Sequence, residues 1–239
     1  MFNQQSQHEM NTLPARIGFF YFTYFAGLGV MLPYFNLYFE KLGLSGFRIG
    51  ALSAVVPAGK ILFSTVWAYR ADRAGGRRGV TIAACALSVA ALLLFLFFTS
   101  FGGLMLACVA LAIVDAPRLP LTEATTLELV HRDRVEYGRM RGWGSIGFIV
   151  SSLATGALLA VAPTRVVIYA ALGWTVLNAA ASIGLPAVPH EARGPRTSLV
   201  SSLRRPGVIV FLAGCLLMLA IHGAYYAFFS IHMERSGFT

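Results

Sequence analysis

The segment LYFEKLGLS at residues 37–45 recurs as IHMERSGFT at residues 231–239, 194 positions later throughout. Glu40 matches Glu234, Lys41 matches Arg235 and Gly43 matches Gly237, so the charged and glycine positions agree. A fixed offset of this kind indicates an internal repeat. Because each copy closes a long apolar run, the repeat predicts two related halves.

The apolar runs around the repeat set the fold class. Hydrophobic residues make up 57% of the 239 residues and charged residues only 12%, against about a quarter charged in a soluble domain. This composition excludes an ordinary soluble enzyme and a disordered chain. A helix needs about 20 apolar residues to cross a bilayer. We therefore predict an all-α polytopic membrane protein with seven spans: 17–39, 49–69, 80–99, 104–121, 143–162, 166–186 and 208–231.

The segment HEARGPRTSLVSSLRRP, residues 190–206, separates the sixth span from the seventh. It is polar, has proline in it and at its end, and lacks a hydrophobic period, as a linker does. We predict a six-span N-terminal half (1–189), a cytoplasmic linker (190–206) and the first span of an incomplete second half (207–239). Two six-helix parallel repeats need about five more spans, so we expect a truncated chain rather than a complete six-plus-one design.

The distribution of Lys and Arg predicts the orientation. The net charge is +9, but the basic residues fall in short clumps between apolar runs, unlike the basic face of a nucleic-acid-binding protein. With the N-terminus in the cytoplasm, cytoplasmic segments hold thirteen Lys and Arg and outer segments four, as the positive-inside rule requires. The cytoplasmic residues are Arg16, Arg70, Arg73, Arg77, Arg78, Arg132, Arg134, Arg139, Arg141, Arg193, Arg196, Arg204 and Arg205. We predict a multi-pass protein of the cell (inner) membrane.

The fourth span carries charges where charges are costly. Its apolar run 104–114 is too short to cross, so the crossing continues through Asp115, Arg118 and Glu123. Charged residues inside membranes usually face a bundle interior or a water-filled cavity. At about 100° per residue, these three fall in one arc with Thr122 and Thr126. We predict a polar stripe that contacts substrate, with ion pairing that only fixes helix packing as the alternative.

Two prolines and three further polar residues add to this expectation. Pro117 and Pro120 free backbone carbonyls that are candidate substrate acceptors. Lys60 lies mid-span and is a candidate partner for Asp115, or for a substrate carboxylate. His222 is a candidate proton carrier or a satisfied core histidine, and Tyr225 a cavity wall or an interfacial residue.

Other chemistries have no sequence support. Cys85, Cys108 and Cys215 lie in apolar runs without metal-ligand spacing, which predicts small buried side chains. There is no GxxxxGK[ST] motif, so no ATP site is expected. We expect no cofactor, no metal, no nucleic-acid partner and no enzyme activity. The glycines of GWGSIGF (142–148) predict close helix packing.

Several motifs resemble the major facilitator superfamily. The loop after the second span, Ala68-Tyr-Arg-Ala-Asp72-Arg73-Ala-Gly75-Gly-Arg77-Arg78, resembles its G-x-x-x-D-R-x-G-R-R signature, with Ala68 in place of the leading glycine and one residue inserted. Residues 21–45, 120–148 and 222–239 look like the proton-coupled branch with lactose permease and the phenylpropionate permeases. The resemblance implies a gating role for Asp72, Arg73 and Arg77. It also implies that Glu123 and Arg141, eighteen residues apart, bind substrate.

Two functions from different classes follow. The first is the N-terminal part of a proton-coupled uptake transporter for a small organic solute, with an aromatic carboxylate as a candidate. Its substrate ligands would be Glu123, Arg141, Asp115, Arg118 and Tyr225, and its proton carriers His222 and Glu123. The second is a truncated, non-transporting membrane protein that acts through a partner or self-association. An intramembrane enzyme is a distant third.

Overall fold

The computed structural model describes residues 2–73, 76–132, 136–188 and 206–237, and for residues 2–11, 72, 224, 226 and 227 only the backbone. Every regular element in these ranges is a helix: α1 Phe2–Lys41, α2 Gly46–Arg73, α3 Arg77–Phe97, α4 Phe101–Asp115, α5 Arg118–His131, α6 Tyr137–Leu159, α7 Val166–Ile183 and α9 Pro206–Arg235. Seven helical stretches are long and apolar enough to cross a membrane. The predicted all-α fold with seven spans is therefore confirmed; the predicted linker lies almost wholly outside the described residues.

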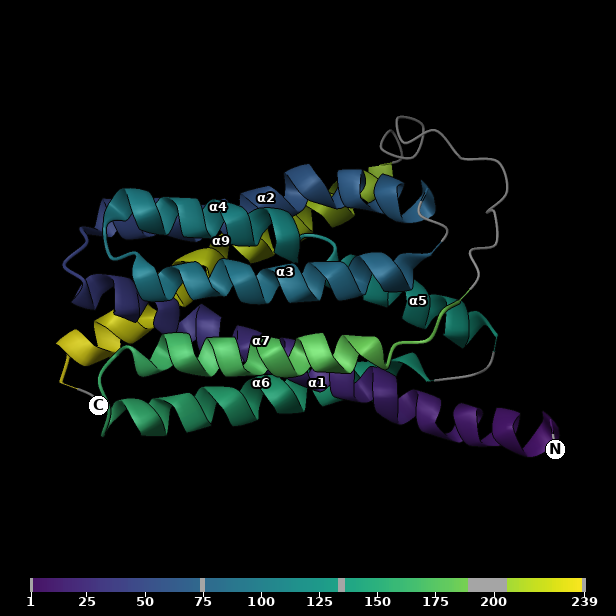
Figure 1. Ribbon diagram of the computed structural model, residues 1–239. Helices are drawn as coiled ribbons and strands as arrows, with labels where there is room; N and C mark the ends of the chain where they lie inside the picture. Colours follow the sequence, from purple (N-terminus) through teal and green to yellow (C-terminus); the bar gives the residue numbers. More distant parts are fainter. Residues whose placement is uncertain (1, 74–75, 133–135, 189–205, 238–239) are drawn as a thin grey trace.

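The helices run roughly along one direction as a bundle (Figure 1). Helix α1 is central: it packs most extensively on α6 and then on α7, while α2 packs on α4, and α3 on both α7 and α4. Many large apolar side chains of the bundle are exposed, among them Phe47, Ile61, Phe97 and Leu153. Many exposed apolar side chains fit a lipid environment, in which they need no burial.

The fourth predicted span is not one continuous helix. Helix α4 ends at Asp115 and α5 begins at Arg118, because Pro117 has no N–H for the helix ladder. The helix that contains the fifth predicted span begins before Trp143. Helix α6 begins at Tyr137 and so carries Arg141 on the helix itself, since a helix can continue past the apolar run that marks it in the sequence.

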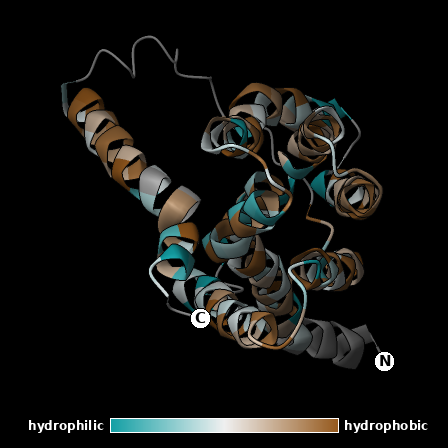
Figure 2. Cartoon of the chain, turned by 90° about the vertical axis from the view of Figure 1, so that its left-hand side faces the viewer, coloured by the Kyte–Doolittle hydropathy of each residue, from teal (hydrophilic) through white to brown (hydrophobic). Residues whose placement is uncertain are grey.

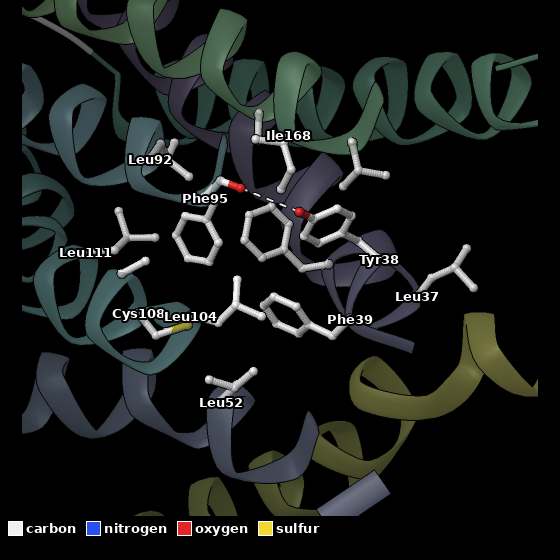
Figure 3. Packing of buried hydrophobic residues seen from close by; sticks show 14 of the residues in the cluster. Leu37, Tyr38, Phe39, Leu52, Leu92, Phe95, Leu104, Cys108, Leu111 and Ile168 are labelled. Carbon is white, nitrogen blue, oxygen red and sulfur yellow. Dashed lines mark hydrogen bonds between the residues drawn. The ribbon is translucent and has the colours of Figure 1, made fainter. Parts of the chain in front are cut away.

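Two apolar clusters fill the interior at different levels of the bundle. One gathers the C-terminal half of α1 with α2, α3, α4 and α7 (Figure 3), including Phe39, Phe95 and Leu104. The other surrounds Ile17, Phe20 and Tyr21 near the start of the first span, with Leu129 and Met140. Tyr24 belongs to this second cluster, and with the neighbouring buried Thr23 it brings polar groups of α1 into the bundle interior.

The contact between α1 and α6 depends on glycine. A Cβ atom on Gly147 would overlap the Phe22 backbone carbonyl, and one on Gly29 would overlap Ser151 Oγ and the Phe148 carbonyl. Backbone atoms cannot move aside as a side chain can, so both positions need glycine. The predicted role of the GWGSIGF glycines is confirmed for Gly147, whereas a Cβ on Gly142 would meet nothing within 4 Å.

We expect Gly147→Ala to destabilise the protein by about 1–3 kcal/mol, because overpacking pushes α6 away from α1. Gly142→Ala on the same helix is the matched control and should be neutral or slightly stabilising. The free energy of unfolding in mixed detergent micelles measures both. Equal stability of the two variants would contradict the close packing at Gly147.

Helix α9 lies apart from the bundle except near its C-terminal end (Figure 2). Among the described side chains of its most apolar window none is buried, and Ile231 near its end reaches the core. This end repeats the end of α1. Gly43 N–H donates to the Glu40 carbonyl at 2.8 Å and Gly237 N–H to the Glu234 carbonyl at 3.0 Å, and the two glycines have φ of 80° and 84°. The 194-residue repeat thus has the same helix-terminating geometry twice.

The two ends are joined by crossed ion pairs. Arg235 Nε donates to Glu40 Oε1 at 2.8 Å, and Lys41 Nζ lies 2.5 Å from Glu234 Oε1. Each acidic residue of one copy therefore contacts the basic residue of the other, as expected for two equivalent surfaces that face each other across a pseudo-twofold axis.

We expect Glu40→Arg to separate the ends of α1 and α9, because two arginines would then face each other. Nitroxide labels at Phe47 and Ser236, in a background with Cys215→Ser, should give a broader distance distribution by double electron–electron resonance. The charge swap Glu40→Arg/Arg235→Glu should restore the narrow distribution. A distribution that Glu40→Arg leaves unchanged would show that the ion pairs do not hold α9.

Candidate functional site

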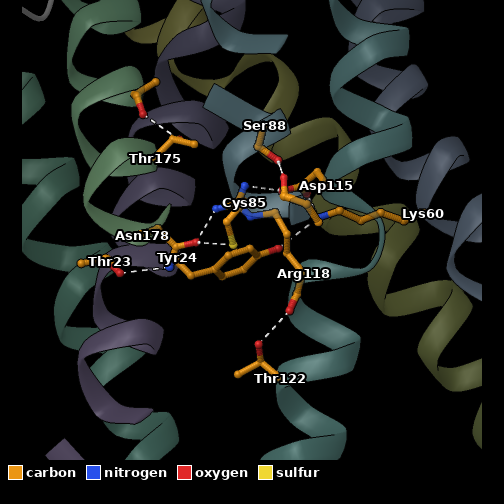
Figure 4. A network of polar contacts seen from close by, with 12 residues as sticks. Thr23, Tyr24, Lys60, Cys85, Ser88, Asp115, Arg118, Thr122, Thr175 and Asn178 are labelled. Carbon is orange, nitrogen blue, oxygen red and sulfur yellow. Dashed lines mark hydrogen bonds and ion pairs between the residues drawn. The ribbon is translucent and has the colours of Figure 1, made fainter. Parts of the chain in front are cut away.

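Asp115, the last residue of α4, is the centre of a buried polar network (Figure 4). Its Oδ2 lies 3.0 Å from Lys60 Nζ of α2, and its Oδ1 accepts a hydrogen bond of 2.7 Å from Arg118 Nη1 of α5. The predicted pairing of Lys60 with Asp115 is present. Asp115 and Arg118 are only 7% and 5% exposed, so this is a desolvated cluster, in which an unpaired charge is costly.

The break at Pro117 places these groups. Because α4 ends at Asp115 and α5 starts at Arg118, both charged side chains project from the junction of the two helices. The guanidinium of Arg118 lies 5.1 Å from the centre of the Tyr24 ring of α1. Lys60 Nζ also donates to Tyr24 Oη at 3.4 Å. Tyr24 therefore contacts both cations of the cluster.

Asn178 of α7 ties the network to α1 and α3. Its Oδ1 accepts a 2.6 Å hydrogen bond from Arg118 Nη2 and a 3.6 Å contact from Cys85 Sγ. Its Nδ2 donates to Thr23 Oγ1 and to the Phe20 carbonyl, both at 3.0 Å. The sequence analysis missed Asn178. The available signal was a lone amide in an apolar span, since polar side chains there commonly bond across helices.

A cavity of about 40 Å³ adjoins the network. Its polar lining comprises Thr23, Tyr24, Lys60, Asp115, Arg118 and Thr175, and its apolar lining comprises Gly27, Leu28, Met31, Val56, Leu92 and Leu111. Six helices thus contribute to one space. It is large enough for one or a few water molecules or a small polar head group, but not for a whole organic solute.

Glu123 and Arg141 form a second, more accessible pair. Arg141 Nε of α6 lies 3.4 Å from Glu123 Oε1 of α5, and Tyr137 Oη donates to Glu123 Oε2 at 2.9 Å. The side chains of Arg141 and Glu123 are 35% and 22% exposed. The eighteen-residue spacing therefore does bring these two residues into contact.

Aromatic rings of α1 connect the two pairs. The guanidinium of Arg141 lies 3.9 Å from the centre of the Phe25 ring and 5.9 Å from that of Tyr21. Phe25 in turn contacts Tyr24, with ring centres 5.2 Å apart, and Tyr24 contacts Arg118. The predicted stripe on the fourth span therefore divides into two neighbouring charge clusters. Thr122 and Thr126 are buried, and each donates to a carbonyl one turn back.

The carbonyls freed by the two prolines accept hydrogen bonds from α2. Pro117 leaves the Ile113 carbonyl without its helical donor, and Trp67 Nε1 donates to this oxygen at 2.7 Å. Pro120 does the same to the Ala116 carbonyl, to which Ser64 Oγ donates at 3.4 Å. These carbonyls join α2 to the helix break, because buried carbonyls require donors; their use by a substrate stays a prediction.

His222 and Tyr225 are not brought to either pair. Both are exposed on α9, where His222 Nδ1 lies 2.8 Å from the Met218 carbonyl and Tyr225 stacks on Phe229 at 4.7 Å. The predictions of a satisfied core histidine and of a cavity wall are therefore not met here, since α9 packs on the bundle only at its end.

The loop after α2 is described in part. The side chain of Asp72 lies outside the described residues. Arg73 is exposed and stacks over Tyr69 at 4.9 Å, and Arg77 begins α3. Arg78 Nη2 donates to the Ile183 carbonyl at 2.8 Å, where a cation at the C-terminus of α7 is favoured by the helix dipole. Cys85 and Cys108 are buried as predicted, whereas Cys215 is half-buried. No cluster of metal ligands occurs among the described residues.

Seven membrane-length helical stretches, with ion pairs buried between several of them, define a multi-pass membrane protein. The family described as "MFS_1 like family" matches residues 15–239, and the chain belongs to this family.

Comparison with individual proteins agrees with this assignment. The chain is 29% identical over 234 residues to the "Probable 3-phenylpropionic acid transporter" of Escherichia coli (strain K12), covering 92% of this chain and 59% of the relative. It is 29% identical over 179 residues to the "Maltose permease" of Geobacillus stearothermophilus, covering 74% and 45%. The crystal structure of nucleoside transporter NupG shares the fold, with a TM-score of 0.68, 16% identity and coverage of 87% and 53%. The relatives are transporters rather than enzymes, and the chain spans about half the length of each.

Proposed function

We propose that this chain forms the N-terminal part of a secondary transporter that takes up a small organic solute by alternating access. The observation that carries the proposal is the pair of charge clusters inside the bundle, one of them beside a cavity, in a chain of this family. Charged residues inside membrane spans commonly mark substrate or ion pathways.

In this mechanism the accessible pair binds solute and proton. Glu123 has Arg141 and Tyr137 on its two oxygens. A proton on Glu123 weakens the ion pair and leaves Arg141 free to bind a solute oxygen. Because Phe25 and Tyr21 already hold the guanidinium, Arg141 stays in place when its partner is protonated. The proton and solute steps are thereby coupled through one carboxylate.

The crossed ion pairs between α1 and α9 close one end of this pathway. Alternating access requires two repeats to rock against each other, and Glu40–Arg235 and Lys41–Glu234 are contacts between equivalent segments of the repeat. In the proposed cycle they part when that end opens. With the N-terminus in the cytoplasm of the cell (inner) membrane, as the loop charges favour, the closed end is the outer one and Asp72, Arg73 and Arg77 lie at the inner gate. Tyr225 and His222 would reach the solute or proton only after α9 is enclosed.

An alternative is a membrane protein that does not transport and acts through a partner or self-association. The observation that favours it is the exposed apolar length of α9, with Val210, Leu216 and Ile221 among its exposed residues.

Uptake of radiolabelled 3-phenylpropionate, maltose and uridine by membrane vesicles tests the proposal. Vesicles would hold this chain alone, or this chain with a second polypeptide that carries the part of the E. coli relative beyond the match. We expect gradient-dependent accumulation of one solute when both polypeptides are present. Solute binding without accumulation in either preparation would support the alternative, and neither binding nor accumulation would overturn the proposal.

A further inference from the structure

The cluster around Asp115 is not electrically neutral. Lys60 and Arg118 are two cations on one carboxylate, and the other side chains of the network, Tyr24, Cys85 and Asn178, carry no charge. One positive charge is therefore left over beside the cavity. By contrast, Glu123 and Arg141 cancel each other. An uncompensated charge in a desolvated bundle is costly, so this excess favours an anion.

A second observation points the same way. Arg118 lines the cavity and is 5% exposed, yet its Nε–H is buried without a hydrogen-bond partner among the described residues. Its other guanidinium nitrogens are used, Nη1 by Asp115 and Nη2 by Asn178. Leaving a buried charged donor unpaired is destabilising, and an incoming acceptor would remove that cost.

The geometry limits what the anion can be. The cavity of about 40 Å³ accepts a head group and no more, so the rest of the solute must extend past Lys60, whose side chain is 36% exposed. The walls are apolar at Met31, Val56 and Leu111. A carboxylate on an apolar body matches the charge, the size and the lining together.

We propose that the cavity is a carboxylate subsite, in which Lys60 and Arg118 bind the head group of a monocarboxylate solute while Asp115 holds both cations in place. This inference rests on the proposed function and names the substrate class: an organic monoanion rather than a neutral sugar or nucleoside. Lys60 is the residue that determines specificity, because its removal leaves Asp115 and Arg118 as a neutral pair.

Equilibrium binding to the purified 239-residue chain in detergent tests this. The probes are radiolabelled 3-phenylpropionate and its neutral isostere 3-phenylpropanamide, with maltose and uridine as neutral probes of other shape. We expect 3-phenylpropionate to bind more tightly than the amide. Lys60→Gln should weaken binding of the acid by about 10- to 100-fold. Binding of the amide should change little. Lys60→Arg should keep the preference, and Arg165→Gln, which removes an exposed loop cation, should change nothing.

Other outcomes overturn the inference in distinguishable ways. Equal binding of acid and amide, or tighter binding of maltose or uridine, would contradict the carboxylate subsite. Neither result would contradict the proposed function. A preference that survives Lys60→Gln but is lost in Arg141→Gln moves the carboxylate to the Glu123 pair. If none of the probes binds, the inference is overturned, and the vesicle experiment then tests the proposed function separately. A single symmetric peak in size-exclusion chromatography shows that each variant is folded.

Discussion

Asp115→Asn is expected to destabilise the protein by about 3–5 kcal/mol, the cost of removing one partner from a buried ion pair. Asp115 is the shared counter-ion of Lys60 and Arg118 at 3.0 and 2.7 Å, so its loss leaves two positive charges facing each other. Arg118 is buried between Tyr24 and Asn178, where water can compensate its charge only poorly. The free energy of unfolding in mixed micelles measures the effect.

The control is a variant in which all three charges are removed, Asp115→Asn/Lys60→Gln/Arg118→Gln. Neutral groups of similar shape are tolerated better than an unpaired charge, so this triple variant should be more stable than Asp115→Asn alone. A single variant as stable as the unmodified protein, or a triple variant less stable than the single one, would contradict the role of Asp115 as counter-ion.

Glu123→Gln should instead abolish uptake and leave the fold intact. In the two-polypeptide vesicles we expect the initial rate to fall by about 100-fold or more, since the amide cannot take up and release the proton. The free energy of unfolding should change by no more than about 1 kcal/mol, because partly exposed ion pairs contribute little to stability. Substitution of Asp115 is thus expected to lower stability, whereas substitution of Glu123 is expected to lower uptake.

Glu128→Gln is the matched control on the same helix. Glu128 pairs with Arg132 at 3.2 Å, four residues away, at the end of α5, and its loss should leave both uptake and stability near those of the unmodified protein. Full uptake by Glu123→Gln would contradict the assignment of Glu123 to the transport site. Equal losses in Glu123→Gln and Glu128→Gln would indicate a general effect of charge on α5.

Side-chain patterning predicted the pairings that are local or complementary in charge. Asp115 and Arg118 are three residues apart at one helix junction, and Lys60 is the one basic residue inside the second predicted span. The resemblance singled out Glu123 and Arg141 as substrate ligands, which stays a prediction, and the structure brings the two side chains to 3.4 Å. The predictions of pairing succeeded because a charge within a membrane span has few permitted partners.

Asn178, Trp67 and Ser64 could not be assigned in the same way. Asn178 contacts Arg118, Cys85 and Thr23 from a helix that lies 60 residues beyond Arg118 in the chain. Trp67 and Ser64 reach carbonyls that prolines on another helix have freed. The stripe on the fourth span was predicted as one surface, but its charges belong to two clusters. Asp115 and Arg118, on either side of Pro117, share one cluster, and Glu123, further along α5, pairs with Arg141 in the other.

The apolar runs and the polar segments between them determined that this chain forms membrane-length helices and how many there are. The charges within these runs predicted that charged side chains lie in the interior of the bundle. Those properties follow from the free energy of moving each residue between water and lipid, which is local to the sequence. The tertiary structure alone decided which charges share a counter-ion, that one positive charge remains beside a cavity, and that His222 and Tyr225 lie away from it. The reason is physical: helix packing joins residues that are far apart in the chain, and the glycines and prolines that set each approach act through three-dimensional contacts.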